Sequence, residues 1–243
     1  MKIGVLQTGS VPEEIIDQHG SYITMFERML QRADPSFSAV LWDVNVAGQI
    51  PASPDDADGW IITGSKHGVY EGHDWIEPLK AFLREAHAAR SPIVGVCFGH
   101  QILAEALGGK VEKSDRGWGC GIHTYTVDQH APWMDEAKET IAIQALHQDQ
   151  VVVLPPEAKV LAHSEFCPYA ALAYGETAMS VQPHPEFDAS FKKDIIGLRR
   201  GAAIPEAIAD SALEKIDGPT DSEMFGRWIT NFFRHASTHR TAA

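Results

Sequence analysis

The first half of the chain alternates between short apolar runs and longer segments in which apolar residues recur at helical spacing. Short, almost wholly apolar runs are typical of strands buried on both faces. Apolar positions repeating every three or four residues are typical of helices with one buried stripe. The pattern predicts strands over residues 2–9, 38–44, 58–65 and 92–98, and helices over residues 22–33, 75–90 and 99–109.

Buried strands that alternate with helices predict a parallel sheet with helices on both faces. Right-handed crossovers then build a doubly wound sheet, in which the ligand crevice lies outside the carboxyl ends of the strands. Gly9, Gly64 and Cys97 fall at those ends. We therefore expect the functional site where these three positions meet.

The middle of the chain shows a different pattern, with strand-like segments joined by short turns. This predicts a block of antiparallel or mixed strands. The segments are residues 120–127, 140–147, 159–164, 169–175 and 178–184.

The helical spacing returns after Glu186, most clearly over residues 204–213 and 221–237. We expect the last five residues, 239–243, to fray. The predicted architecture is α/β: a doubly wound, mostly parallel sheet with the added strand block and a C-terminal helical extension.

Length and composition fit one ordinary globular domain. The chain has 243 residues, of which 44% are hydrophobic and 22% charged, and its formal net charge is −13. An acidic surface repels phosphate backbones, so nucleic acid is not an expected partner. No apolar stretch approaches the length of a membrane span, so no membrane association is predicted.

The three cysteines are Cys97, Cys120 and Cys167. An odd number without framework spacing argues against a disulfide scaffold, and the N-terminal residues are typical of a first strand rather than a secretory signal. We expect free thiols and a cytoplasmic location. Neither an H-E-x-x-H motif nor a paired C-x-x-C occurs, so no metal site or other cofactor is predicted.

Cys97 is the candidate nucleophile because of its surroundings. Gly95-Val96-Cys97-Phe98-Gly99 places small residues two positions to each side, between a predicted strand and a predicted helix. This is the context of a nucleophile elbow, where a sharp turn leaves no room for a Cβ. A helix N-terminus also favours thiolate over thiol. The alternative is a buried cysteine that only packs.

A thiolate of this kind needs a base, and the stretch 180–187 offers one. His184 and Glu186 are two residues apart, so in an extended backbone their side chains point the same way, and the flanking prolines favour that geometry. Glu186 could then orient the His184 ring. A plain surface turn is the alternative. The rival bases are His100, expected to point away from the sulfur, and the pair His147 and Asp149, expected on a loop at the site rim.

Stabilising an oxyanion requires two N–H donors near the nucleophile. One should be the N–H of Phe98, the residue after the nucleophile. The second should come from the loop after the strand that ends at Gly64 and Ser65. A plain turn that needs glycine for its geometry is the alternative.

These pieces together resemble the class I, triad-type glutamine amidotransferases, over about residues 1–190 of a single domain 1–243. The matching stretches are Gly95 to Gln101, Thr63-Gly64-Ser65 and His184-Pro185-Glu186, and within the family the glutaminase part of GMP synthase and its stand-alone relatives are most similar. No phosphate-binding loop of a synthetase follows; residues 191–243 form the extension instead.

The resemblance implies a flavodoxin-like sheet, a triad of Cys97, His184 and Glu186, and an oxyanion hole formed by the N–H groups of Ser65 and Phe98. It also implies that Gln101 helps hold the substrate's amino-acid end and that Gly64 is a further substrate-binding residue. In this sequence Ser65 stands where the family often has glycine.

The expected activity is hydrolysis of the side-chain amide of glutamine through a γ-glutamyl thioester, with release of ammonia. One alternative is a γ-glutamyl peptidase that acts on γ-glutamyl peptides or conjugates. Another is a glutaminase subunit that is active only with a separate synthetase partner.

Overall fold

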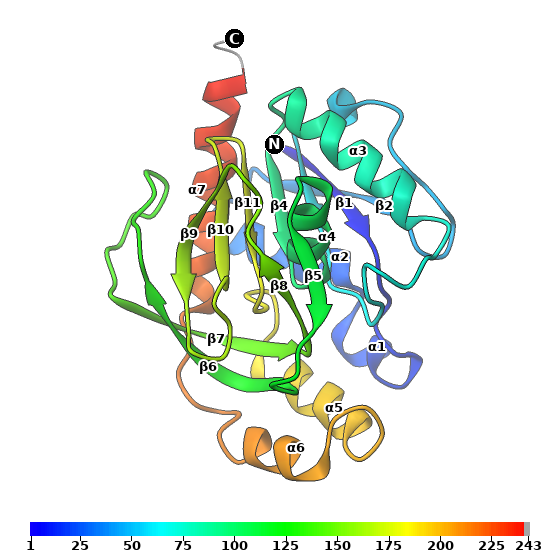
Figure 1. Cartoon of the computed structure of the whole chain (residues 1–243), viewed down its shortest axis with the longest axis vertical. Helices are drawn as coiled ribbons and strands as arrows, with labels where there is room; N and C mark the ends of the chain where they lie inside the picture. Colours follow the sequence, from blue (N-terminus) through cyan, green and yellow to red (C-terminus); the bar gives the residue numbers. More distant parts are fainter. Residues whose placement is uncertain (241–243) are drawn as a thin grey trace.

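The structure is a computed structural model that describes residues 1–240. It contains a large mixed sheet and a two-stranded sheet (Figure 1). The strands are β1 (Lys2–Gln7), β2 (Ser38–Asp43), β3 (Gly59–Ile62), β4 (Ile93–Val96), β5 (Lys110–Lys113), β6 (Gly119–Val127), β7 (Thr140–His147), β8 (Asp149–Val153), β9 (Ala158–His163), β10 (Ala171–Tyr174) and β11 (Ala178–Val181).

Seven α-helices and one short 3₁₀-helix accompany these strands within residues 1–240. In α2, α3 and α7 the buried apolar residues recur at the helical spacing that the sequence predicts, whereas α4 is buried along almost its whole length. The helices are α1 (Glu13–His19), α2 (Tyr22–Ala33), η1 (Pro54–Asp56), α3 (Ile76–Ala88), α4 (Phe98–Ala106), α5 (Ala189–Arg199), α6 (Glu206–Leu213) and α7 (Ser222–Arg240).

The large sheet has the order β2-β1-β3-β4-β11-β10-β9-β6-β7. The first five strands pair in parallel, and the remaining pairs are antiparallel. This confirms the predicted doubly wound sheet with an added antiparallel block. Because β11 returns beside β4, the segment after β11 begins next to the carboxyl end of β4, where Cys97 lies.

Helices cover both faces of the parallel part of the sheet. On one face, α3 and α4 pack against Trp60 and Ile62 of β3, while on the other α2 and α7 pack on the side to which Ile61 points. This alternation follows from the side-chain period of two in a strand. Figure 1 shows α5 and α6 together beneath the ribbon formed by β6 and β7.

Some details differ from the sequence-based expectations. The predicted loop around His147 and Asp149 is instead the junction of two strands, β7 and β8. Helix α1 was not predicted. Helix α7 continues to Arg240, so fraying is wrong for residues 239 and 240, and residues 241–243 lie outside the described residues. None of the helices in residues 1–240 combines the length and apolar character needed to cross a bilayer.

Candidate active site

Cys97 occupies the sharp turn between β4 and α4. Its backbone has φ 54° and ψ −104°, a left-handed φ that non-glycine residues rarely adopt. Its N–H donates to the carbonyl of Val181 at 2.9 Å, which ties the turn to the end of β11. Strained backbone of this kind persists only where the surroundings impose it, and it concentrates at functional sites.

The two glycines that flank Cys97 are required by close packing. A Cβ on Gly95 would lie 2.4 Å from the carbonyl oxygen of Gly99, and a Cβ on Gly99 would lie 2.2 Å from the carbonyl oxygen of Ile62. Both distances are far below any normal contact, and the atoms met are backbone. The crowding expected from the sequence pattern is therefore confirmed.

His184 reaches this turn from the other half of the chain. Its backbone N–H donates to the carbonyl of Gln144 at 2.8 Å, and its side chain is 4% exposed. Its Nδ1 lies 2.7 Å from Oε1 of Glu186, whose side chain is fully buried. The ring of Phe187 stacks on the imidazole, with centroids 4.0 Å apart and planes 5° from parallel. The imidazole is thus held in one orientation.

The charges around His184 favour its protonated form. Burial lowers the pKa of His184, but the negative charges of Glu186 and Cys97, with hydrogen bonds to both, outweigh it and raise the pKa from 6.5 to about 9. An imidazolium in this position would in turn stabilise a thiolate on Cys97. The structure therefore brings together the three residues predicted to form the triad.

The rival bases do not fit the role. The Nδ1 atom of His100 lies 2.8 Å from the hydroxyl of Ser180, and burial lowers the pKa of His100 to about 3. Burial also lowers the pKa of His147 to about 3, and its Nδ1 contacts the backbone oxygen of Asp149 at 3.2 Å, not the carboxylate. An imidazole with so low a pKa is a weak base and would not become an imidazolium at neutral pH.

The loop after β3 lies directly against the candidate triad. A Cβ on Gly64 would lie 2.9 Å from Cε1 of His184 and 3.7 Å from Cβ of Cys97. Thr63 anchors the loop, since its Oγ1 accepts a hydrogen bond from the N–H of Thr8 at 3.0 Å. Ser65 follows, and its hydroxyl accepts the N–H of His67 at 3.2 Å. Glycine at position 64 thus leaves space for the imidazole.

A hollow of about 300 Å³ opens above Cys97, and Ser65 and Gln101 are among the residues that line it. The amide nitrogen of Gln101 donates to the backbone oxygen of Asp149 at 2.9 Å and to Oε1 of Gln182 at 3.1 Å. Phe98 is the first residue of α4, so its N–H has no acceptor within the helix.

Several residues of this region were not predicted from the sequence. Lys66, Lys113 and Arg199 bring three cationic side chains to the wall of the hollow. Behind the imidazole, Lys192 is fully buried; it donates to the carbonyl of Ala145, and its Nζ lies 5.8 Å from the centre of the Phe187 ring.

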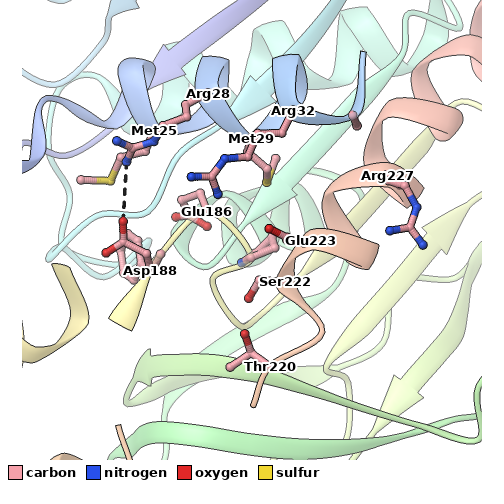
Figure 2. Close-up of a pocket in the computed structure, with 13 residues that line it drawn as sticks. Met25, Arg28, Met29, Arg32, Glu186, Asp188, Thr220, Ser222, Glu223 and Arg227 are labelled. Atoms are coloured by element: carbon pink, nitrogen blue, oxygen red, sulfur yellow. Dashed lines mark ion pairs between the residues drawn. The ribbon is translucent and has the colours of Figure 1, made fainter. Parts of the chain in front are cut away.

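A second hollow, of about 650 Å³, lies between α2, the turn that carries Glu186 and the start of α7. Figure 2 shows Arg28 and Arg32 extending from α2 toward this turn. Arg28 makes a long ion pair of 3.9 Å with Asp188, and both side chains are partly exposed. The turn that carries the candidate triad carboxylate is therefore bordered by a mixed-charge surface.

The fold is a doubly wound α/β sheet, and its candidate site combines a cysteine at a strand-to-helix turn with a buried His–Glu pair. The chain belongs to the class-I glutamine amidotransferase family, whose model matches residues 14–196. The fold agrees with that family: a crystal structure of a glutamine amidotransferase from Thermotoga maritima superposes with a TM-score of 0.78 at 19% identity and covers 98% of each chain.

Relatives within the family carry different names. Gamma-glutamyl peptidase 5 of Arabidopsis thaliana is 32% identical over 164 residues, which cover 64% of this chain and 65% of that protein. A glutamine-hydrolyzing GMP synthase subunit of Halobacterium salinarum is 29% identical over 173 residues, which cover 71% of this chain and 87% of that protein. The matches to gamma-glutamyl peptidases 5 and 3 span about two thirds of those proteins, 65% and 66%.

Proposed function

We propose that this protein hydrolyses the γ-amide bond of γ-glutamyl compounds, with glutamine as the first substrate and Cys97, His184 and Glu186 as the catalytic triad. The observation that carries the proposal is the 2.7 Å contact between His184 and Glu186 on an imidazole that also interacts with Cys97. A nucleophile, a base and a group that orients the base are the minimum set for acyl transfer through a covalent intermediate.

In the first half of the reaction, the Cys97 thiolate attacks the side-chain carbonyl carbon of glutamine. The carbonyl oxygen becomes an oxyanion, which accepts hydrogen bonds from the N–H groups of Ser65 and Phe98. When the tetrahedral intermediate collapses, the C–N bond breaks and His184 gives its proton to the leaving nitrogen. Ammonia departs, and a γ-glutamyl thioester remains on Cys97.

In the second half, water attacks the thioester and neutral His184 takes one of its protons. The second tetrahedral intermediate collapses with breakage of the C–S bond and releases glutamate. The Cys97 thiolate and protonated His184 are restored. Throughout, Glu186 holds the ring by its Nδ1 atom and stabilises the imidazolium.

The amino-acid end of the substrate would bind at the far wall of the hollow. The amide nitrogen of Gln101 is engaged with protein acceptors, so its carbonyl oxygen is the group that suits the substrate's α-ammonium. Lys66, Lys113 and Arg199 line the same hollow and suit its α-carboxylate. Gly64 would contribute space rather than a side chain.

A γ-glutamyl peptide is the second candidate substrate. The names of relatives such as gamma-glutamyl peptidase 5 favour it. So does the wall of the hollow, where Tyr70, Trp118 and Leu146 offer apolar surface to a leaving group larger than ammonia. The chemistry at Cys97 would be unchanged except that His184 protonates an amine.

One assay separates these substrates. Ammonia release from glutamine is compared with amine release from a γ-glutamyl dipeptide, using the wild-type protein and Cys97→Ser. We expect turnover of at least one substrate and its near-complete loss in Cys97→Ser. Efficient dipeptide cleavage with negligible ammonia release would overturn glutamine as the first substrate, and wild-type rates in Cys97→Ser would overturn the mechanism.

Dependence on a partner is a third form of the same function. A glutamine-hydrolyzing GMP synthase subunit is among the relatives, and an oxyanion hole can remain unformed until a partner docks. If glutaminase activity were absent from the isolated chain and appeared on addition of a separate ATP-dependent synthetase, this form would be supported. Equal activity with and without the synthetase would exclude it.

A further inference from the structure

The loop between β3 and α3 gathers two histidines and a glutamate around one point. Nδ1 of His67 lies 3.0 Å from Oε2 of Glu71, and Nε2 of His73 lies 2.9 Å from the same oxygen. The three ligand atoms are all within 4.8 Å of one another. The two imidazole rings face each other edge to face, with centroids 4.2 Å apart.

These separations are close to those of a tetrahedral metal site. Two atoms that bind one zinc ion at about 2.0 to 2.1 Å lie about 3.3 Å apart in tetrahedral geometry. Both nitrogen–oxygen separations here are within a few tenths of an ångström of that value. A movement of a few tenths of an ångström along these two separations would admit a metal ion in place of the two bridging protons, and the two imidazole nitrogens lie within 4.8 Å of each other.

The loop that carries these residues is held in place. The N–H of Glu71 donates to the carbonyl of Gly68 at 3.1 Å, which closes a turn, and the hydroxyl of Tyr70 donates to the Asp149 carboxylate at 2.9 Å. The ring of His73 stacks on Trp75, with planes 6° from parallel and centroids 5.9 Å apart. Preorganised ligands of this kind lower the entropy cost of binding a metal.

We propose that His67, Glu71 and His73 form a binding site for one divalent transition-metal ion of the zinc class, with a fourth coordination position open to water. Two imidazole nitrogens and one carboxylate are a ligand set that suits zinc, cobalt and nickel and does not suit magnesium or calcium, which prefer oxygen alone. The sequence carries the set as H-x₃-E-x-H, a spacing that differs from H-E-x-x-H.

The site lies at the rim of the hollow above Cys97, because His67 and Glu71 line that hollow. Trp75, which stacks on His73, also packs against Phe98, with ring centroids 5.5 Å apart. A bound metal ion would therefore fix the loop that carries Ser65 next to the candidate oxyanion hole. All three proposed metal ligands belong to this loop and none to the candidate triad. If no metal bound here, the proposed hydrolysis would therefore still stand.

The test titrates cobalt(II) into chelator-treated protein that carries Cys97→Ser, so that the nucleophile cannot bind the metal. Visible absorption reports the coordination of cobalt, and calorimetry gives the stoichiometry and affinity. We expect one cobalt ion per chain with the absorption of a four-coordinate site. Weak metal sites have dissociation constants on the order of 100 micromolar. If binding of cobalt did not saturate at about this concentration, the proposal would be overturned.

Variants locate the site. His73→Gln and the isosteric Glu71→Gln should each weaken binding by more than the roughly tenfold to hundredfold that loss of an outer-shell partner costs. The matched control is His235→Gln, which belongs to the second His–Glu cluster, Glu176, His235 and His239. Loss of binding in His235→Gln, or unchanged binding in both loop variants, would assign the metal elsewhere and overturn the proposal. Circular dichroism checks that each variant is folded.

Discussion

Gly64 is the position at which one added methyl group would disturb the candidate triad most directly. A Cβ there would lie 2.9 Å from Cε1 of His184, whereas ordinary contact begins at 3.4 Å, so the imidazole or the loop must move, by about 0.5 Å if ordinary contact is to be restored. The backbone of Gly64 does not have a positive φ, so alanine is allowed there. The substitution should therefore act through the steric contact with His184 and not through a change in the allowed backbone conformation.

The size of the effect follows from that displacement. A misplacement of about 1 Å can cost roughly a hundredfold in rate, so half of it should cost about tenfold. Tenfold in kcat/KM corresponds to about 1.4 kcal/mol of lost transition-state stabilisation. The assay measures ammonia from glutamine, or amine from a γ-glutamyl dipeptide if that is the substrate turned over, for Gly64→Ala and the wild-type protein.

Gly197→Ala is the matched control. Gly197 lies in α5, its φ is not positive, and a Cβ there would meet nothing within 4 Å. Alanine should raise stability by up to about 1 kcal/mol and leave kcat/KM unchanged. If Gly64→Ala kept a kcat/KM within twofold of the wild type while folding normally, the position of His184 would not limit the reaction, and the reasoning would be refuted.

Three further outcomes are expected. The kcat/KM profile should fall on the alkaline side near pH 9, where His184 loses its proton. Glu186→Gln should move this alkaline limb to lower pH, because the substitution removes a charge that raises the pKa of His184. An alkaline limb that did not move would contradict this. Burial lowers the pKa of Lys192 from 10.5 to about 7. Burying this side chain therefore lowers the free energy of unfolding by its full amount below pH 7, and by progressively less as the pH rises toward 10.5. Lys192→Met should therefore raise Tm most at pH 7 and below, with the gain shrinking as the pH rises, and exposed Lys193→Met should show no such trend. Gly99→Ala should lower Tm markedly, because the added Cβ meets a backbone carbonyl of β3, and an unchanged Tm would be evidence against the close packing at the elbow.

Much of the fold could be predicted because the central parallel strands are almost wholly apolar. Strands β3 and β4 are buried at every residue, and such runs between helical stripes leave few other arrangements. Helix α1 escaped prediction because only Ile15 and His19 are buried in its seven residues. Strand β8 escaped because it begins with polar Asp149 and Gln150, which favour a loop when only local pattern is considered.

Some residues of the candidate site could likewise be identified from the sequence, and others could not. Cys97, His184 and Glu186 could be chosen as candidates because the glycine spacing and the His-Pro-Glu stretch are local signals. Glu186 lies in a turn, however, and not in the extended backbone that the flanking prolines predicted. The burial of Lys192 could not be predicted from its residue type, yet it lies on the same helical face as Ile195 and Ile196, and that spacing was a signal. The cationic residues around the hollow come from the loop after β3, from strand β5 and from helix α5, so only the tertiary structure brings them together.

Peptide mapping by mass spectrometry after treatment with a glutamine-like chloroketone tests the central claim most directly. Burial raises the pKa of Cys167 to about 12 and also raises the pKa of Cys120, so neither thiol should react at neutral pH. We predict a single adduct, on Cys97, that forms more slowly in His184→Ala and in the presence of glutamine. Inactivation with an adduct on another residue and Cys97 intact would contradict the account.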